Sequence, residues 1–118
     1  KEVRTIMAKM FFSQIDQTKM VTAASELARN TITFGNGGVV NIYRVTEDSI
    51  EGVTIVFKDF GPGITDIELA LQDGYSSLNG MGVGLGGARR LVDDFQIESA
   101  INIGTIIKIT KWLKNTIK

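Results

Sequence analysis

The stretch DFGPGITDIELALQDGYSSLNGMGVGLGG, from Asp59 to Gly87, decides how this chain is interpreted. Two glycine patterns lie within it: Asp59-x-Gly61-x-Gly63 and Gly80-x-Gly82-x-Gly84. Each glycine increases the backbone entropy that is lost on folding. Two separate runs of glycine at every second position are therefore more than a simple turn requires. Bare N–H groups at the start of a helix form a concavity that suits phosphate. The stretch therefore predicts an anionic ligand held against the backbone, and a helix after Gly82.

Composition limits the class of protein. With 118 residues, 43% of them hydrophobic and 22% charged, the chain is expected to form one globular domain over residues 1–118. Thirteen basic residues balance thirteen acidic ones, so charge gives no reason to expect nucleic acid or an anionic membrane as partner. No apolar run approaches the roughly 20 residues of a membrane span, and we expect a soluble, cytoplasmic protein.

The chain contains neither cysteine nor histidine. This composition excludes disulfides, metal sites built on thiolate or imidazole, and the commonest general base. Acid–base chemistry must therefore depend on carboxylates.

Hydrophobic periodicity predicts two helices followed by two hairpins. The segments are a helix over Lys1–Phe12, a helix capped by Asp16 that ends near Phe34, strands over Val39–Val45 and Val53–Phe57, and strands over Phe95–Ile101 and Thr105–Leu113. With the helix after Gly82, this order predicts an α/β two-layer sandwich. Its sheet is expected to be mixed, mainly antiparallel, and covered by helices on one face.

The second helix offers one candidate buried face and, on its flank, a polar row. The apolar positions are Val21, Ala24, Ala28 and Ile32, and the polar row is Thr22, Glu26 and Asn30. Glu26 and Asn30 lie one turn apart and supply oxygen atoms suited to a hard cation such as Mg²⁺. A glutamate and an asparagine at this spacing are also common on a solvated helix face. The pair alone does not distinguish a Mg²⁺ site from an ordinary solvated surface.

Asp59 directly follows an apolar strand and precedes Gly-Pro-Gly. Its carboxylate could accept a hydrogen bond from an exocyclic amine deep in a pocket, while the glycines admit a flat ring. The alternative is a strand that ends in an ordinary Asp turn. Gly104-Thr105 has even less meaning alone, because it is typical of a hairpin turn.

The four elements in order carry more weight than any one of them. Glu26-x-x-x-Asn30, Asp59-x-Gly61-x-Gly63, Gly80-x-Gly82-x-Gly84 and Gly104-Thr105 resemble the N, G1, G2 and G3 boxes of the gyrase, Hsp90, histidine-kinase and MutL superfamily of ATP-binding domains. Within that superfamily the whole chain is similar to the small serine/threonine kinases that regulate sigma factors, the stressosome switch-kinase type. The stretches SELARN, DFGPGI, DGYSS, GVGLGGARRLVDDF and TKWL carry this similarity.

The resemblance implies a role for each box. Glu26 would be the catalytic base, and Asn30 would ligate Mg²⁺. Asp59 would bind the adenine amine with support from Thr105, and Gly61, Gly63, Gly80, Gly82 and Gly84 would shape the ATP pocket. The substrate implied is a serine or threonine on a STAS-domain protein, with a phosphatase or other effector downstream.

Two departures from the family pattern stand out. No lysine or arginine occurs from Ile64 to Gly87, where several relatives place a basic residue to meet the γ-phosphate. Charge neutralisation would then fall to Mg²⁺, to backbone amides, to Arg89 or Arg90, or to the bound partner, and the two arginines could equally be surface charges on a helix. The family's N-terminal strand is not found in this sequence, and by comparison with the family pattern we expect about fifteen residues to be missing. That strand would cover a sheet edge, which bears on partner docking and on a homodimer.

Three hypotheses follow. The leading one is a protein serine/threonine kinase that uses Mg-ATP; the alternative is a nucleotide-dependent, anti-sigma-like binding module with little catalysis. The catalytic domain of a sensor histidine kinase ranks last, because no phosphoacceptor histidine is present.

Overall fold

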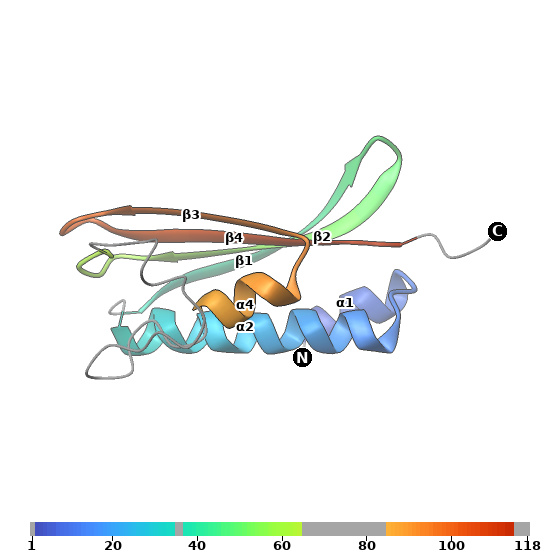
Figure 1. Cartoon of the computed structure of the whole chain (residues 1–118), viewed down its shortest axis with the longest axis horizontal. Helices are drawn as coiled ribbons and strands as arrows, with labels where there is room; N and C mark the ends of the chain where they lie inside the picture. Colours follow the sequence, from blue (N-terminus) through green and yellow to red (C-terminus); the bar gives the residue numbers. More distant parts are fainter. Residues whose placement is uncertain (1, 35–36, 65–84, 115–118) are drawn as a thin grey trace.

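The computed structural model describes residues 2–34, 37–64 and 85–114. Its elements are α1 (Glu2–Lys9), α2 (Gln14–Phe34), β1 (Gly38–Glu47), β2 (Ile50–Asp59), α4 (Leu85–Leu91), β3 (Asp94–Ala100) and β4 (Gly104–Trp112). Figure 1 shows the helices together on one side of the sheet, with α4 beside α2. The predicted two-layer α/β sandwich is confirmed. None of these helices is long and apolar enough to cross a bilayer.

The sheet has the order β1-β2-β4-β3, and each neighbouring pair of these described strands is antiparallel. Both predicted hairpins are therefore present. The second hairpin adds to the first through β4, so that Lys58 on β2 pairs with Ile106 on β4. This pairing brings the C-terminal end of β2 and the N-terminal end of β4 to the same end of the sheet. Asp59 and Thr105, 46 residues apart in the chain, consequently lie next to each other.

The core lies between this sheet and α2. Its central side chains are buried: Met20, Ala23 and Leu27 on α2, Val53, Ile55 and Phe57 on β2, and Ile107 and Ile109 on β4. The predicted buried face of α2 was therefore partly wrong. Val21, Ala24 and Ala28 only flank the core, and Ile32 is 72% exposed. The larger side chains of Met20 and Leu27 fill the space under the sheet and set the rotation of the helix.

The start of α2 also differs from the prediction. Ser13, not Asp16, is the N-cap: its hydroxyl oxygen accepts the Asp16 N–H at 3.1 Å, and its carbonyl accepts the Gln17 N–H at 2.9 Å. A short hydroxyl side chain that satisfies a first-turn N–H is what this position favours. The helix therefore begins at Gln14, and the Asp16 carboxylate is left for another contact.

That contact is with Lys111, a buried lysine on β4. Its ammonium group donates to the Leu91 carbonyl at 3.1 Å and approaches the carboxylates of Asp16 at 3.6 Å and Asp93 at 3.8 Å. Removing one partner from a buried ion pair leaves a costly unpaired charge, so this cluster is expected to be fixed. It joins the start of α2, the end of α4 and β4.

Asp93 titrates differently from a free aspartate. Burial alone would raise the pKa of its carboxyl group. The hydrogen bond from the Trp112 N–H, the hydrogen bond from the Lys114 ammonium and the charge of Lys111 outweigh burial and lower that pKa below its ordinary value. The ionised form of Asp93 therefore stabilises the fold.

Candidate functional site

The Asp59 carboxylate is held by two backbone N–H groups. Its Oδ1 accepts the Gly61 N–H at 3.0 Å and the Thr105 N–H at 3.1 Å. One oxygen is thus engaged from two sides, and the orientation of the carboxylate is defined. Among the hydrogen bonds of the described residues, none involves Oδ2, so this atom can serve as an acceptor for a ligand.

Thr105 supports Asp59 through its backbone, whereas its hydroxyl faces Ser99. The Thr105 and Ser99 hydroxyl oxygens are 2.9 Å apart, and Ser99 also accepts the Ile64 N–H at 2.6 Å. The Thr105 side chain is buried and Ser99 is half-buried, so these contacts are partly shielded from water. The strand end, the loop after it and the β3–β4 hairpin are therefore joined by hydrogen bonds around the carboxylate.

Two glycines at this corner are required by their geometry. Gly63 has φ +85°, and a Cβ there would lie 2.5 Å from the Ala100 carbonyl oxygen. Gly104 has φ +140°, and a Cβ there would lie 3.0 Å from the Asp59 carbonyl carbon. Both backbones would be strained by any side chain. Glycine therefore serves close packing of the loop against the hairpin, in addition to the pocket shaping predicted for Gly63.

The C-terminal half of α2 lies against the same corner. Gly38 pairs with Asp59 across β1 and β2, and a Cβ at Gly38 would lie 2.9 Å from both the Asp59 Cα and the Thr31 Cγ2. Asn30 directly precedes Thr31. Glu26 is five residues before Thr31, about 7.5 Å along the helix axis at the usual rise per residue. The distance along the helix axis from Thr31 to Glu26 is therefore shorter than an extended nucleoside triphosphate.

Glu26 and Asn30 are both half-buried on α2. The Glu26 carboxylate forms an ion pair with Arg29, and its side chain is 32% exposed against 62% for Arg29. An exposed pair of this kind contributes little to stability and exchanges partners easily. The ion pair with Arg29 therefore does not fix the Glu26 carboxylate in place.

A metal site made by the protein alone is not supported by the described residues. They contain no cluster of three or more histidine, cysteine, aspartate or glutamate side chains. The amide oxygen of Asn30, with the nearby Glu26 carboxylate, is a donor set that fits Mg²⁺ if phosphate oxygens and water complete the coordination.

Three predicted residues, Gly80, Gly82 and Gly84, lie outside the described residues, as does the segment DGYSS. The helix expected after Gly82 is confirmed from Leu85 to Leu91. Arg89 and Arg90, the basic residues considered for the γ-phosphate, are exposed in its last turn.

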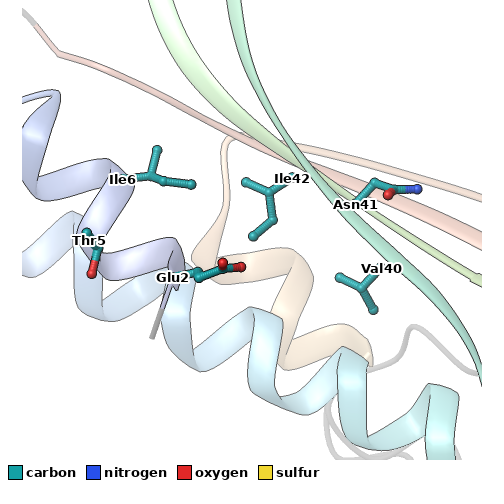
Figure 2. Close-up of a pocket in the computed structure, with 6 residues that line it drawn as sticks. All are labelled: Glu2, Thr5, Ile6, Val40, Asn41 and Ile42. Carbon is teal, nitrogen blue, oxygen red and sulfur yellow. The ribbon is translucent and has the colours of Figure 1, made fainter.

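A groove elsewhere on the molecule is distinct from this corner. It has a volume of about 480 Å³ and lies between α1 and the edge strand β1. Figure 2 shows Ile6 and Ile42 on its two walls, with Asn41 directed to the other side of β1. Its lining is half aliphatic and half polar, and it includes none of the predicted site residues.

Sequence reasoning missed Ser99 and Arg29. Ser99 contacts Ile64, 35 residues away, so only the tertiary fold reveals its partners. Arg29 could have been found, because it is three residues after Glu26 on a predicted helix, a spacing at which opposite charges meet.

Comparisons with known proteins identify the family. Residues 15–115 match the model of the family described as histidine kinase-, DNA gyrase B-, and HSP90-like ATPase. The chain is 39% identical to the serine/threonine-protein kinase RsbT of Bacillus subtilis (strain 168), over 94% of this chain and 84% of that protein. It is 36% identical to the anti-sigma F factor of Bacillus licheniformis and 33% identical to that of Clostridium novyi (strain NT), over 90% and 89% of this chain and 80% of each relative. The chain therefore belongs to the histidine kinase-, DNA gyrase B- and HSP90-like ATPase family.

Proposed function

We propose that this chain is a serine/threonine protein kinase that uses Mg-ATP to phosphorylate a STAS-domain protein. Its role would be in bacterial stress or sigma-factor regulation by partner switching, in the cytoplasm where such partners act. The observation that carries the proposal is the Asp59 carboxylate, whose Oδ1 is held by two backbone N–H groups beside the C-terminal half of α2. Similarity to a protein named as a serine/threonine kinase supports the reaction class.

Asp59 supplies the recognition of adenine. With Oδ1 engaged by Gly61 and Thr105, Oδ2 can accept a hydrogen bond from the exocyclic amine of the base. A hydrogen bond to a charged acceptor contributes roughly 1.5–3 kcal/mol, which is enough to select adenine over a base that has a carbonyl at that position. The bare backbone at Gly61 and Gly63 lets the ring approach.

Glu26 supplies the base. The oxygen of the substrate hydroxyl forms a bond to the γ-phosphorus while the bond between that phosphorus and the β-phosphate oxygen breaks. The hydroxyl proton passes to the Glu26 carboxylate, and ADP leaves. Phosphoryl transfer depends mainly on positioning and on charge stabilisation, so one carboxylate on a packed helix is chemically sufficient.

Asn30 is the protein ligand we assign to Mg²⁺, which would offset phosphate charge when bound. Since the segment after Ile64 has no basic residue up to Gly87, positive charge from the protein must come from elsewhere. Arg29 is a further candidate: it is exposed, it already pairs with Glu26, and it lies on the same helix as Asn30.

The test is direct. The chain is incubated with Mg-ATP and a purified STAS-domain protein encoded beside it, and the STAS protein is analysed for the mass of one added phosphate on serine or threonine. Transfer that requires Mg²⁺ and the chain supports the proposal. A complex without any transfer would favour the second candidate, an anti-sigma-like binding module, which the similarity to anti-sigma F factors also suggests.

A further inference from the structure

Ser99 occupies a position at which three parts of the site converge. Its hydroxyl oxygen lies 2.6 Å from the Ile64 nitrogen, 2.9 Å from the Thr105 hydroxyl and 3.3 Å from the Gly104 carbonyl oxygen. Ile64 is the last described residue of the loop that follows Asp59, and the other two residues begin β4. One side chain on β3 therefore joins this loop to the neighbouring strand.

The direction of the hydrogen bond between Ile64 and Ser99 is fixed by the chemistry of its two groups. A serine hydroxyl has one proton and two acceptor positions. The Ile64 N–H can only donate, so the Ser99 oxygen accepts it, and the Ser99 proton is available for Thr105 or for the Gly104 carbonyl. Thr105 in turn donates its backbone N–H to Asp59 Oδ1. Ser99 and the Asp59 carboxylate are therefore connected through one residue, Thr105.

The packing around Ser99 leaves the loop little freedom. The Asn102 N–H donates to the Pro62 carbonyl at 2.9 Å, and Gly63 lies so close to Ala100 that a Cβ would meet its carbonyl oxygen at 2.5 Å. The loop is pressed against the hairpin tip at both points. Ser99 completes this contact at Ile64, where no other hydrogen bond among the described residues holds the loop.

We propose that Ser99 is a positioning residue that sets the base selectivity of the nucleotide site, by fixing Thr105 and Ile64 and hence the direction of the free oxygen of Asp59. The inference rests on the proposed function. Ser99 does not touch the nucleotide; it acts through Thr105. Without its hydroxyl, β4 and the loop can shift relative to each other, and the Asp59 carboxylate accepts the adenine amine less well.

The test compares two nucleotides by calorimetric titration with Mg²⁺ present. ATP has the exocyclic amine, whereas inosine triphosphate has a carbonyl at that position, which the carboxylate repels. We expect the unsubstituted chain to bind ATP roughly 10- to 100-fold more tightly than inosine triphosphate, in line with a charged hydrogen bond. Ser99→Ala should lower this ratio by about fivefold, and Ser99→Thr, which keeps the hydroxyl, should restore most of it.

A loss of stability alone should not change the ratio of the affinities for ATP and inosine triphosphate. A matched control variant tests this point. Thr54 and Thr110 form another buried hydroxyl pair of the same sheet, 2.8 Å apart, and Thr54 is five residues before Asp59 on the opposite face of β2. Thr54→Val removes that hydrogen bond and should leave the ratio unchanged. If Ser99→Ala does not fold, Ser99→Cys, which has similar volume and weak hydrogen bonds, replaces it.

The outcomes separate this inference from the proposed function. A ratio that is unchanged in Ser99→Ala, or lowered equally in Thr54→Val, overturns the role of Ser99 and leaves the kinase proposal intact. If the unsubstituted chain does not prefer ATP, the role of Asp59 fails, and the role of Ser99 fails with it.

Discussion

The two ends of the candidate site are built differently. At the Asp59 end, one carboxylate oxygen accepts two backbone N–H groups, and glycines at positions 63 and 104 let the loop pack on the hairpin. At the Glu26 end, the partner of the carboxylate among the described residues is the exposed Arg29 on its own helix. The end proposed to recognise the base is therefore held by contacts within the chain itself. The end proposed to perform chemistry must be completed by nucleotide and substrate.

This contrast predicts separate effects on binding and on rate, and the largest effect is expected at Glu26. Glu26→Gln keeps the size of the side chain but cannot take the proton. We expect phosphoryl transfer to fall roughly 10²- to 10⁴-fold, the usual contribution of a general base, while ATP affinity changes little. Single-turnover kinetics with the STAS protein, together with calorimetry for ATP, measure both quantities. An unchanged transfer rate would remove Glu26 from the mechanism.

The next effect tests how tightly the Asp59 end is packed. Gly104→Ala places a Cβ in a backbone with φ +140°, against the Asp59 carbonyl carbon and the Phe60 Cα. Strain and overpacking together should reduce the free energy of unfolding by about 2 to 4 kcal/mol, measured with urea. Gly87→Ala is the matched control. Because Gly87 is on α4 with no atom within 4 Å of an added Cβ, that change should stabilise the chain or leave it unchanged.

Asp59→Asn examines recognition at the same end. An asparagine can still accept the Gly61 and Thr105 N–H groups through its one oxygen, so the fold should survive. Its NH₂ group then faces the adenine amine, and ATP affinity should fall roughly 10- to 100-fold. Calorimetry gives the affinity, and circular dichroism controls for folding. Full affinity in a folded variant would mean that the adenine binds elsewhere.

A substitution at Asp93 should change the free energy of unfolding without changing nucleotide binding. Its folded-state pKa is lowered, so its contribution is present above its ordinary value of about 3.9 and is lost as pH falls through the lower folded value. Asp93→Asn should therefore cost about 0.5–1 kcal/mol at pH 7 and nothing below the folded pKa. Urea denaturation at several pH values measures the difference. A gap between the two proteins that persists in strong acid would contradict the ionic origin.

The smallest effect is expected at Arg29. Because its pair with Glu26 is exposed, Arg29→Ala should change the free energy of unfolding by no more than about 0.5 kcal/mol. If Arg29 meets phosphate as well, the rate of transfer will fall while stability does not. A large loss of stability would show that the Glu26 end is more firmly built than its contacts suggest.

Much of this arrangement could be read from the sequence. The period-2 runs gave both hairpins, and the order of the four boxes pointed to Asp59, Glu26 and Asn30. Local chemistry misled at the start of α2, where Ser13 and Asp16 are both acceptable caps and only the contact of Asp16 with Lys111 decides between them.

Long-range contacts were beyond the sequence. The rotation of α2 depends on how Met20 and Leu27 fill the space beneath the sheet, which periodicity alone does not specify. Ser99 looked like any serine on a strand, because its partners become visible only when β4 pairs with β2 and the loop after Asp59 folds back.

The most direct measurement of the central claim is a crystal structure of the chain with Mg²⁺ and a non-hydrolysable ATP analogue. The account predicts the adenine amine at hydrogen-bonding distance from Asp59 Oδ2, the metal on the Asn30 side-chain oxygen, and the terminal phosphate facing Glu26. A nucleotide bound with its base away from Asp59, for instance in the groove between α1 and β1, would contradict it.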